Sequence, residues 1–199
     1  MNERNKNGIM QEEVAPDAPV FEDPPKPQEL PQLIMRAPDI TRLPQLILPD
    51  GVTLHTHRNG DEESWEEIIE SSFCKRFDFD WLKSLGGYEP EYVIYAEKDG
   101  KNLATATAVE NPAYPGEGWF RMIGTHADAR RMGLGRLVCL AALHSLRERG
   151  YKSVVLSTDD DRISALKLYL SLGFEPVYSH ESHKERWEKI FEVLGNKWK

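Results

Sequence analysis

The stretch ARRMGLGRLV, residues 129–138, carries most of the information that the sequence holds on fold and function. Two glycines, Gly133 and Gly135, stand one residue apart, with arginines on both sides and an apolar run after them. Glycine tolerates positive φ angles and close backbone approach, so such a turn can expose successive N–H groups at a helix N-terminus. The pattern indicates either a phosphate-binding loop or an ordinary turn that begins a helix.

Two common phosphate-binding loops do not fit this stretch. A dinucleotide-binding fingerprint requires a third glycine three residues after Gly135, and that position is Val138. A P-loop requires Gly-Lys followed by Ser or Thr, whereas Gly135 is followed by Arg136 and Leu137. What remains is an RxxGxG pattern, with positive charge and free N–H groups suited to a pyrophosphate.

The residues around this stretch predict an α/β protein with one mixed sheet. Alternation and turn residues predict strands within 51–58, 91–110 (a hairpin around Lys98–Lys101), 118–126, 151–160 and 174–178. Helical spacing and end signals predict helices within 60–73, 75–85, 134–150, 162–173 and 184–195. Consecutive strands favour antiparallel pairing and the later strand–helix–strand units favour parallel pairing, so helices are expected on both faces of the sheet.

Composition divides the chain into three parts. Residues 1–34 are rich in proline and acidic residues, which predicts a flexible arm, because such a segment buries too little apolar surface to offset its ordering entropy. Residues 35–50 carry more Leu and Ile between prolines and are expected to form an extended lead-in without regular structure. Residues 51–199 are expected to form the folded domain.

The overall charge and composition exclude several classes of protein. The net charge of -8 argues against general binding to nucleic acid or to anionic membranes, which need a basic surface. The two cysteines, Cys74 and Cys139, form no disulfide framework or CxxC motif, which is typical of a reduced compartment. The first residues lack the apolar core of a signal peptide, and no apolar run is long enough to span a membrane, so we expect a cytoplasmic protein.

A second motif downstream gives the sequence a family resemblance. ALKLYLSLGF, residues 165–174, is similar to motif B (A-x-x-L-Y-x-x-x-G-F) of the GCN5-related N-acetyltransferase (GNAT) superfamily, and RxxGxG resembles its motif A. The resemblance covers roughly residues 50–178, with both motifs in the expected order. It implies the acyl-CoA N-acyltransferase fold, with antiparallel N-terminal strands and a splayed parallel strand pair flanked by helices.

The resemblance also implies a ligand and roles for particular residues. Acetyl-CoA would be the co-substrate, without a metal, and a small-molecule or peptide amine would be the acceptor, in a monomer or a homodimer. Tyr169 matches the tyrosine that often protonates the departing thiolate, so it is the candidate general acid. The residues expected to hold the pantetheine arm and the pyrophosphate are Ile123, Gly124, Thr125, Arg130, Arg131, Met132, Gly133, Leu134, Gly135 and Arg136.

Three features depart from the family pattern. The strand within 118–126 has no acidic residue, so the general base is unassigned among Glu117, His126 and Asp159–Asp161, with Asp161 favoured as a helix cap. Arg162 stands where motif B often has Asn. Residues 182–195, where the family usually has a final hairpin, have a helical pattern. Near this segment, His180 and His183 lack further ligands for a metal site, and with Trp187 they suit a substrate wall or a surface patch. The alternatives to an enzyme are a non-catalytic acyl-CoA sensor or scaffold and a nucleotide-binding protein of another kind.

Overall fold

The computed structural model describes residues 30–195 and residue 198. Contacts divide the chain into Met1–Leu30 and Pro31–Lys199, and every element described lies in the second unit. The predicted flexible arm therefore lies almost wholly outside the described residues. The element order is β1 (Leu33–Ala37), β2 (Val52–Thr56), α1 (Glu62–Phe73), α2 (Phe79–Ser84), η1 (Pro90–Tyr92), β3 (Val93–Lys98), β4 (Lys101–Glu110), β5 (Gly118–Thr125), η2 (Ala127–Ala129), α3 (Leu134–Glu148), β6 (Val154–Thr158), α4 (Ile163–Ser171), β7 (Glu175–Val177) and α5 (His183–Leu194).

The strands form one mixed sheet in the order β2-β3-β4-β5-β6-β1-β7, which confirms the predicted fold class. All neighbouring strands are antiparallel except β5 and β6, which α3 connects as a parallel pair. The predicted hairpin joins β3 to β4 through Asp99 and Gly100, whose φ angles of 52° and 73° are typical of a tight hairpin turn.

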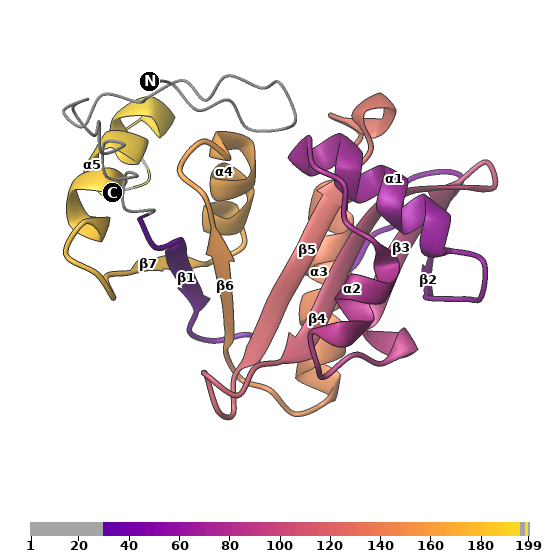
Figure 1. Ribbon diagram of the computed structural model, residues 1–199, viewed down its shortest axis with the longest axis horizontal. Coiled ribbons are helices and arrows are strands. Elements are labelled where there is room, and N and C mark those ends of the chain that lie inside the picture. Colours follow the sequence, from indigo (N-terminus) through magenta and orange to yellow (C-terminus); the bar gives the residue numbers. More distant parts are fainter. Residues whose placement is uncertain (1–29, 196–197, 199) are drawn as a thin grey trace, which may run out of the picture. The chain divides into compact units, whose positions relative to one another are not determined.

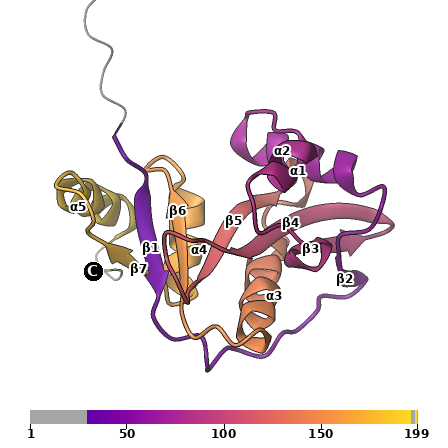
Figure 2. The ribbon, with the colours of Figure 1, turned by 60° about the horizontal axis from the view of Figure 1, so that its bottom comes forward.

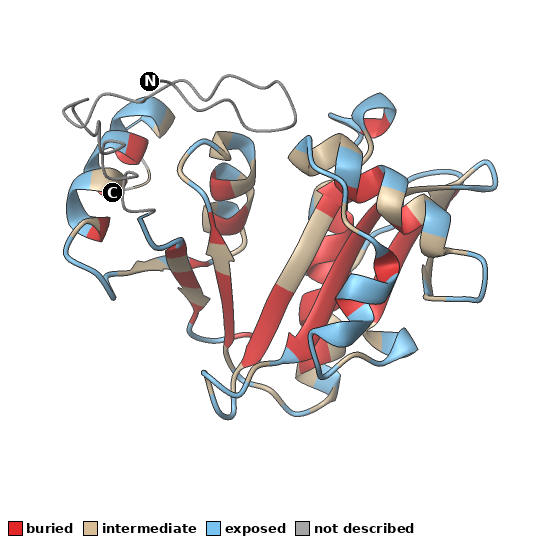
Figure 3. Cartoon of the chain, viewed as in Figure 1, coloured by how far each residue is buried: buried red, intermediate tan, exposed pale blue. Residues whose placement is uncertain are grey.

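Helices cover both faces of the sheet (Figure 1), and each face has its own core. Alternation along β3 places Val93 and Tyr95 against the helix α1, while Ile94 and Ala96 belong to the core that contains α3. The α3 face of β4 carries only alanine at alternate positions, at residues 104, 106 and 108, all fully buried. These small side chains let α3 lie close to the sheet, and burial is concentrated there (Figure 3).

The strand β1 is a feature that the sequence did not predict. The segment expected as an irregular lead-in begins inside a strand that pairs antiparallel with β6 on one side and β7 on the other, as Figure 2 shows. Leu33, Met35 and Ala37 are fully or almost fully buried in the main core. Beyond Ala37 the segment runs without helix or strand until β2, as expected.

The two parallel strands separate after a short common stretch. They pair only from Gly118–Phe120 to Val154–Leu156, whereas β5 continues to Thr125. The register of β5 against β4 shifts between Gly124 and Arg121, and Met122 between them has a φ of 49°. A side chain at positive φ costs roughly 1–3 kcal/mol, so this bulge is a strained feature of the kind that functional sites retain.

Candidate active site

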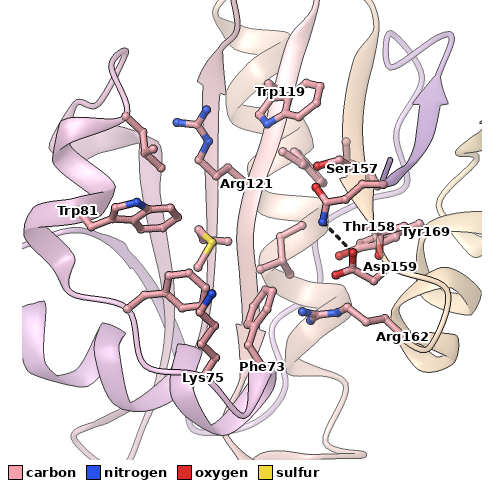
Figure 4. A pocket seen from close by; sticks show the side chains of 17 residues that line it. Phe73, Lys75, Trp81, Trp119, Arg121, Ser157, Thr158, Asp159, Arg162 and Tyr169 are labelled. Atoms are coloured by element: carbon pink, nitrogen blue, oxygen red, sulfur yellow. Dashed lines mark hydrogen bonds between the residues drawn. The ribbon is translucent and has the colours of Figure 1, made fainter. Parts of the chain in front are cut away.

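A cavity of about 550 Å³ lies where β5 and β6 separate. Its wall on one side comes from β5 and the segment that connects α1 to α2, and on the other from β6 and the start of α4 (Figure 4). The lining residues are Gln32, Phe73, Lys75, Phe77, Trp81, Leu85, Trp119, Phe120, Arg121, Met122, Ile123, Leu156, Ser157, Thr158, Asp159, Arg162 and Tyr169. The splay thus creates an elongated space with an aromatic wall and few charges.

The glycine turn before α3 has the geometry of an anion-binding loop. Arg131 and Gly133 both adopt positive φ, at 67° and 80°, and Gly133 is the N-cap of α3. Within the part of the chain that the structure describes, the backbone N–H groups of Arg131 and Gly133 to Arg136 have no hydrogen-bond acceptor. A Cβ on Gly135 would lie 2.9 Å from Thr125 Oγ1, so a side chain there would crowd the strand. The free N–H groups and the helix dipole together fit a pyrophosphate.

The side chains of this loop divide into two groups. Arg130 donates a hydrogen bond of 2.9 Å to the Ser71 carbonyl oxygen, which ties the loop to the end of α1. Arg136 donates one of 3.1 Å to Ser171 Oγ. Arg131 and Met132 are exposed, and Leu134 is buried under the turn. Arg130 is thus a structural residue in this structure, while Arg131 presents its charge to solvent.

The predicted pantetheine residues lie at the end of β5, and Ser72 fixes them. Ile123 lines the cavity. Thr125 donates its N–H to Ser72 Oγ at 2.7 Å and accepts the Ser72 hydroxyl at 3.0 Å. Gly124 faces α1, where a Cβ would lie 2.9 Å from Ser72 Oγ, so its role is close packing. The register shift of β5 against β4 contains Met122 and Ile123 rather than Gly124.

Tyr169 lies in the wall of the cavity. It projects from α4 into the cavity wall, is only 5% exposed, and packs against Phe174 with ring centroids 5.9 Å apart. Among the described residues, its hydroxyl has no hydrogen-bond partner. Burial raises the pKa of Tyr169, so the phenol keeps its proton at neutral pH. Burial likewise raises the pKa of Cys139 to about 12, which leaves that thiol protonated and a poor nucleophile.

The candidate bases separate clearly by position. Asp159 is the one carboxylate among the described lining residues, and its Oδ1 accepts a hydrogen bond of 2.9 Å from Gln32. Glu117 instead forms an ion pair of 2.8 Å with Arg36, outside the cavity wall. His126 Nδ1 accepts the Asp128 N–H at 3.3 Å, as a cap of the short turn after β5.

The other two aspartates after β6 have structural positions. Asp160 forms an ion pair with Arg186 of α5, in which Arg186 Nε lies 2.8 Å from Oδ2. The prediction that Asp161 caps α4 was wrong. The N-cap residue is Arg162, and no side-chain hydrogen bond caps this end of the helix. Arg162 lies with its guanidinium carbon 3.7 Å from the centroid of the Phe73 ring, across the open end of the cavity.

The histidines near the C-terminus are not part of the cavity. His183 and Trp187 are buried at 1% and 0% exposure in the packing of α5, while His180 is exposed and contacts Ser182. Within the described residues, no group of three or more His, Cys, Asp or Glu side chains is arranged to hold a metal. Among the same residues, none of the helices has the length and apolar content that crossing a membrane requires.

A mixed sheet that opens at one parallel strand pair, beside a turn of free N–H groups that begins a helix, is the architecture that the family resemblance implies. Comparison with known families agrees. The model of the acetyltransferase (GNAT) family matches residues 56–174, more than half of the chain. The chain belongs to this family.

Relatives and solved structures support the same assignment. The chain is 33% identical over 141 residues to a mycothiol acetyltransferase of Thermomonospora curvata, covering 66% of this chain and 47% of the relative. It is 32% identical over 155 residues to that of Nocardia farcinica, covering 69% and 50%. The chain thus spans about half the length of these relatives.

The fold is similar to a GCN5-related N-acetyltransferase from Sphaerobacter thermophilus, with a TM-score of 0.61, 24% identity and coverage of 74% of this chain and 50% of that one. It also resembles one from Kribbella flavida, with a TM-score of 0.54, 22% identity and coverage of 73% and 54%. These similarities concern the fold.

Proposed function

We propose that this chain transfers an acetyl group, or a related short acyl group, from acetyl-CoA to an amine acceptor. The observation that carries the proposal is the turn at the start of α3, next to the splayed strands, in which the N–H groups of Arg131 and of Gly133 to Arg136 are free among the described residues. The pyrophosphate would bind these N–H groups, with Arg131 and the helix N-terminus supplying positive charge. The uncharged pantetheine arm would follow β5 past Ile123 into the cavity.

The edge of β5 beyond Phe120 supports this placement. Its pairing with β6 stops at Leu156, so the β6-facing backbone groups of the next residues are free to bond to the amides of the pantetheine arm. The same edge would place an N–H group near the thioester oxygen, where negative charge develops as the amine attacks. The strained bulge at Met122 turns the backbone at that point.

The reaction would be a direct attack without a covalent enzyme intermediate. The amine nitrogen forms a bond to the acyl carbon, the carbon–sulfur bond breaks, and the sulfur leaves with the electron pair. Tyr169 would give its proton to the leaving thiolate, for which its raised pKa and free hydroxyl are suited. Asp159 is the carboxylate in the cavity wall that is available to take the proton lost by the amine.

The name of the curated relatives, mycothiol acetyltransferase, describes those proteins, which are about twice as long as the matched region. It supports acyl transfer as the reaction class for this chain. The acceptor has to be inferred from the residues that line the cavity. The competing function is a non-catalytic acyl-CoA sensor, which the absence of a carboxylate on β5 (Gly118–Thr125) favours.

Gly135→Glu tests the proposal directly. The new side chain would begin 2.9 Å from Thr125 Oγ1 and place a negative charge at the anion site, so we expect coenzyme A to bind at least about 100-fold more weakly, or about 2.7 kcal/mol. Val193→Glu is the control for the added charge, because Val193 is 69% exposed on α5 and does not line the cavity. Calorimetric titration gives both affinities, and an unchanged affinity in Gly135→Glu would contradict the cofactor site.

Activity is then measured as thiol release from acetyl-CoA over a panel of amines. Release that depends on the amine, and is lost in Gly135→Glu, is the expected result. Tight coenzyme A binding with no release on any amine would favour the sensor. Stabilisation by ATP or NAD but not by coenzyme A would contradict both functions.

A further inference from the structure

The cavity contains a half-buried arginine that has no partner. Arg121 projects from β5 into the cavity wall, on the same side as Trp81 and Trp119, while Asp159 and Tyr169 lie on the side of β6 and α4 (Figure 4). Among the residues that the structure describes, none forms a hydrogen bond or an ion pair with its guanidinium. An unpaired, partly desolvated guanidinium is costly unless a ligand supplies the missing anion.

We propose that Arg121 determines acceptor specificity by binding a carboxylate on the acceptor, so that the substrates are amines that also carry a carboxylate, as amino acids do. The inference rests on the proposed acyl transfer, because it assigns the acceptor half of the same cavity. A guanidinium offers two parallel N–H donors that match the two oxygens of a carboxylate.

Among the described residues, the cavity lining supplies no anion to Arg121. The charged lining residues are Lys75, Arg121, Asp159 and Arg162. Asp159 is the only acidic one among the described lining residues, and it is bonded to Gln32 and forms no ion pair with Arg121. Burial alone lowers the pKa of Arg121 from its ordinary value, with no acidic neighbour to raise it.

The other cationic side chains of the cavity are engaged elsewhere. Arg162 stacks on Phe73, with its guanidinium carbon 3.7 Å from the ring centroid. Lys75 is exposed and lies 5.1 Å from the centroid of Phe77. Arg121 is thus the one cation in the described wall that is half-buried and has neither an ion pair nor an aromatic partner. A single guanidinium, with its five N–H donors, suits a carboxylate better than a doubly charged phosphate, which would need a second free cation.

Position along β5 separates Arg121 from the cofactor. The anion-binding turn begins ten residues further along the chain, beyond the end of the strand, and the pantetheine arm between them carries no charge. Arg121 lies two residues before Ile123, or roughly 7 Å along a strand. An acceptor that reaches both the thioester and Arg121 therefore needs only a few bonds between its amine and its carboxylate.

The aromatic wall gives the acceptor a place for an apolar body. Phe77 and Trp81 pack together with ring centroids 4.9 Å apart, and both line the cavity. Trp81 is 38% exposed, so part of its ring system is open to a ligand. We therefore use phenylalanine as the probe, because it carries an amine, a carboxylate and an aromatic ring.

Binding of reaction products tests the inference without requiring turnover. N-acetyl-phenylalanine and its uncharged amide are titrated calorimetrically into protein saturated with coenzyme A. We expect the wild-type chain to bind the acid at least about 10-fold more tightly than the amide, which corresponds to about 1.4 kcal/mol. Arg121→Gln should reduce this preference to about twofold or less. Arg121→Lys should retain part of the preference, because lysine keeps the positive charge but lacks the two parallel N–H donors of the guanidinium.

Arg76→Gln is the matched control, since Arg76 lies between α1 and α2, its side chain is 71% exposed and it does not line the cavity. It should keep the full preference for the acid. Unchanged coenzyme A affinity in Arg121→Gln shows that this variant is folded. If Arg121→Gln does not fold, Arg121→Lys tests the inference instead. Its preference for the acid over the amide should be at least about threefold smaller than that of the wild type. An undiminished preference in Arg121→Lys would contradict the inference.

Equal affinity for acid and amide in the wild type, no measurable binding of the acid, or an undiminished preference in Arg121→Gln would overturn the inference. The inference would also be overturned if a phosphate-bearing amine such as O-phosphoethanolamine bound more tightly than phenylalanine. Turnover is scored separately: the KM of phenylalanine should be at least about 10-fold below that of phenylalaninamide. Absence of turnover with a preserved Arg121-dependent preference would contradict the acyl transfer and leave the carboxylate site standing.

Discussion

Met35→Ala measures what the N-terminal strand contributes to the fold. The Met35 side chain is 0% exposed, between Leu156 of β6 and Pro176 of β7 in the sheet register. Truncating a buried methionine to alanine removes transfer free energy and leaves a cavity, at a cost of about 2–5 kcal/mol. For a domain of this size, each kcal/mol lowers the melting temperature by about 2–4 °C. The expected fall is therefore about 4–20 °C.

Ile47→Ala is the matched control from the same segment, because Ile47 is also apolar but 74% exposed. Its effect on the free energy of unfolding should stay within about 0.5 kcal/mol. Urea titration of both variants, followed by circular dichroism, gives the free energies, and thermal scans give the melting temperatures. Equal stabilities for the two variants would show that β1 is not part of the cooperative core, and the assignment of this strand would be refuted.

Two further predictions concern buried titratable groups. Tyr169→Phe should lower kcat with acetyl-CoA about 100-fold and leave the KM for acetyl-CoA unchanged. With an acetyl thioester of a more acidic thiol the loss in kcat should be much smaller, because that thiolate leaves without being protonated. Equal losses on both substrates would contradict the role of Tyr169 as the acid. Burial raises the pKa of Cys139 from 9.0 to about 12, so stability is intact below pH 9.0 and falls as pH rises toward the folded value. The slope contributed by Cys139 should approach about 1.4 kcal/mol per pH unit. Cys139→Ala should remove this contribution in urea titrations at about pH 8 and about pH 10 and leave the smaller one of Tyr95 and Tyr169, whose pKa values burial also raises; an identical slope in the variant would contradict this cause.

The elements that carry strong local signals were predictable from the sequence. The strands from β2 to β7 and the helices from α1 to α4 lie within the predicted stretches, because each has a periodic apolar pattern and a recognisable end. The helix α5 begins one residue before its predicted stretch, and the short helices η1 and η2 were not predicted. The strand β1 was not predictable in this way. It has five residues, its partners lie more than 100 residues away in sequence, and prolines flank it at positions 31 and 38. Its one local signal is the run Leu33, Ile34, Met35 between those prolines.

The turn proposed to bind the cofactor was predictable from the sequence, and the part of the cavity proposed to bind the acceptor was not. The turn at Gly133 and Gly135 depends on residues adjacent in sequence, so the motif locates it. The acceptor wall combines Trp81 from α2 with Arg121 from β5, forty residues apart, and only the folded chain brings them together. Similarly, Ser72 gave no signal in the sequence, although it holds both backbone groups of Thr125. The sequence signal for Arg121 was an arginine within a strand that carries no acidic residue.

The strand β1 also explains how the sheet can open without losing its last strands. β6 shares three residue pairs with β5 but five with β1, so most of its ladder is made on the side away from the cavity. Without β1, β6 would keep only its short pairing with β5, and the opening would leave most of its backbone groups unpaired. Gln32, directly before β1, bonds to Asp159 at the end of β6. The N-terminal strand therefore fixes both the wall of the cavity and the carboxylate in it, so a shift of β1 should alter acceptor binding before it alters the cofactor loop at α3.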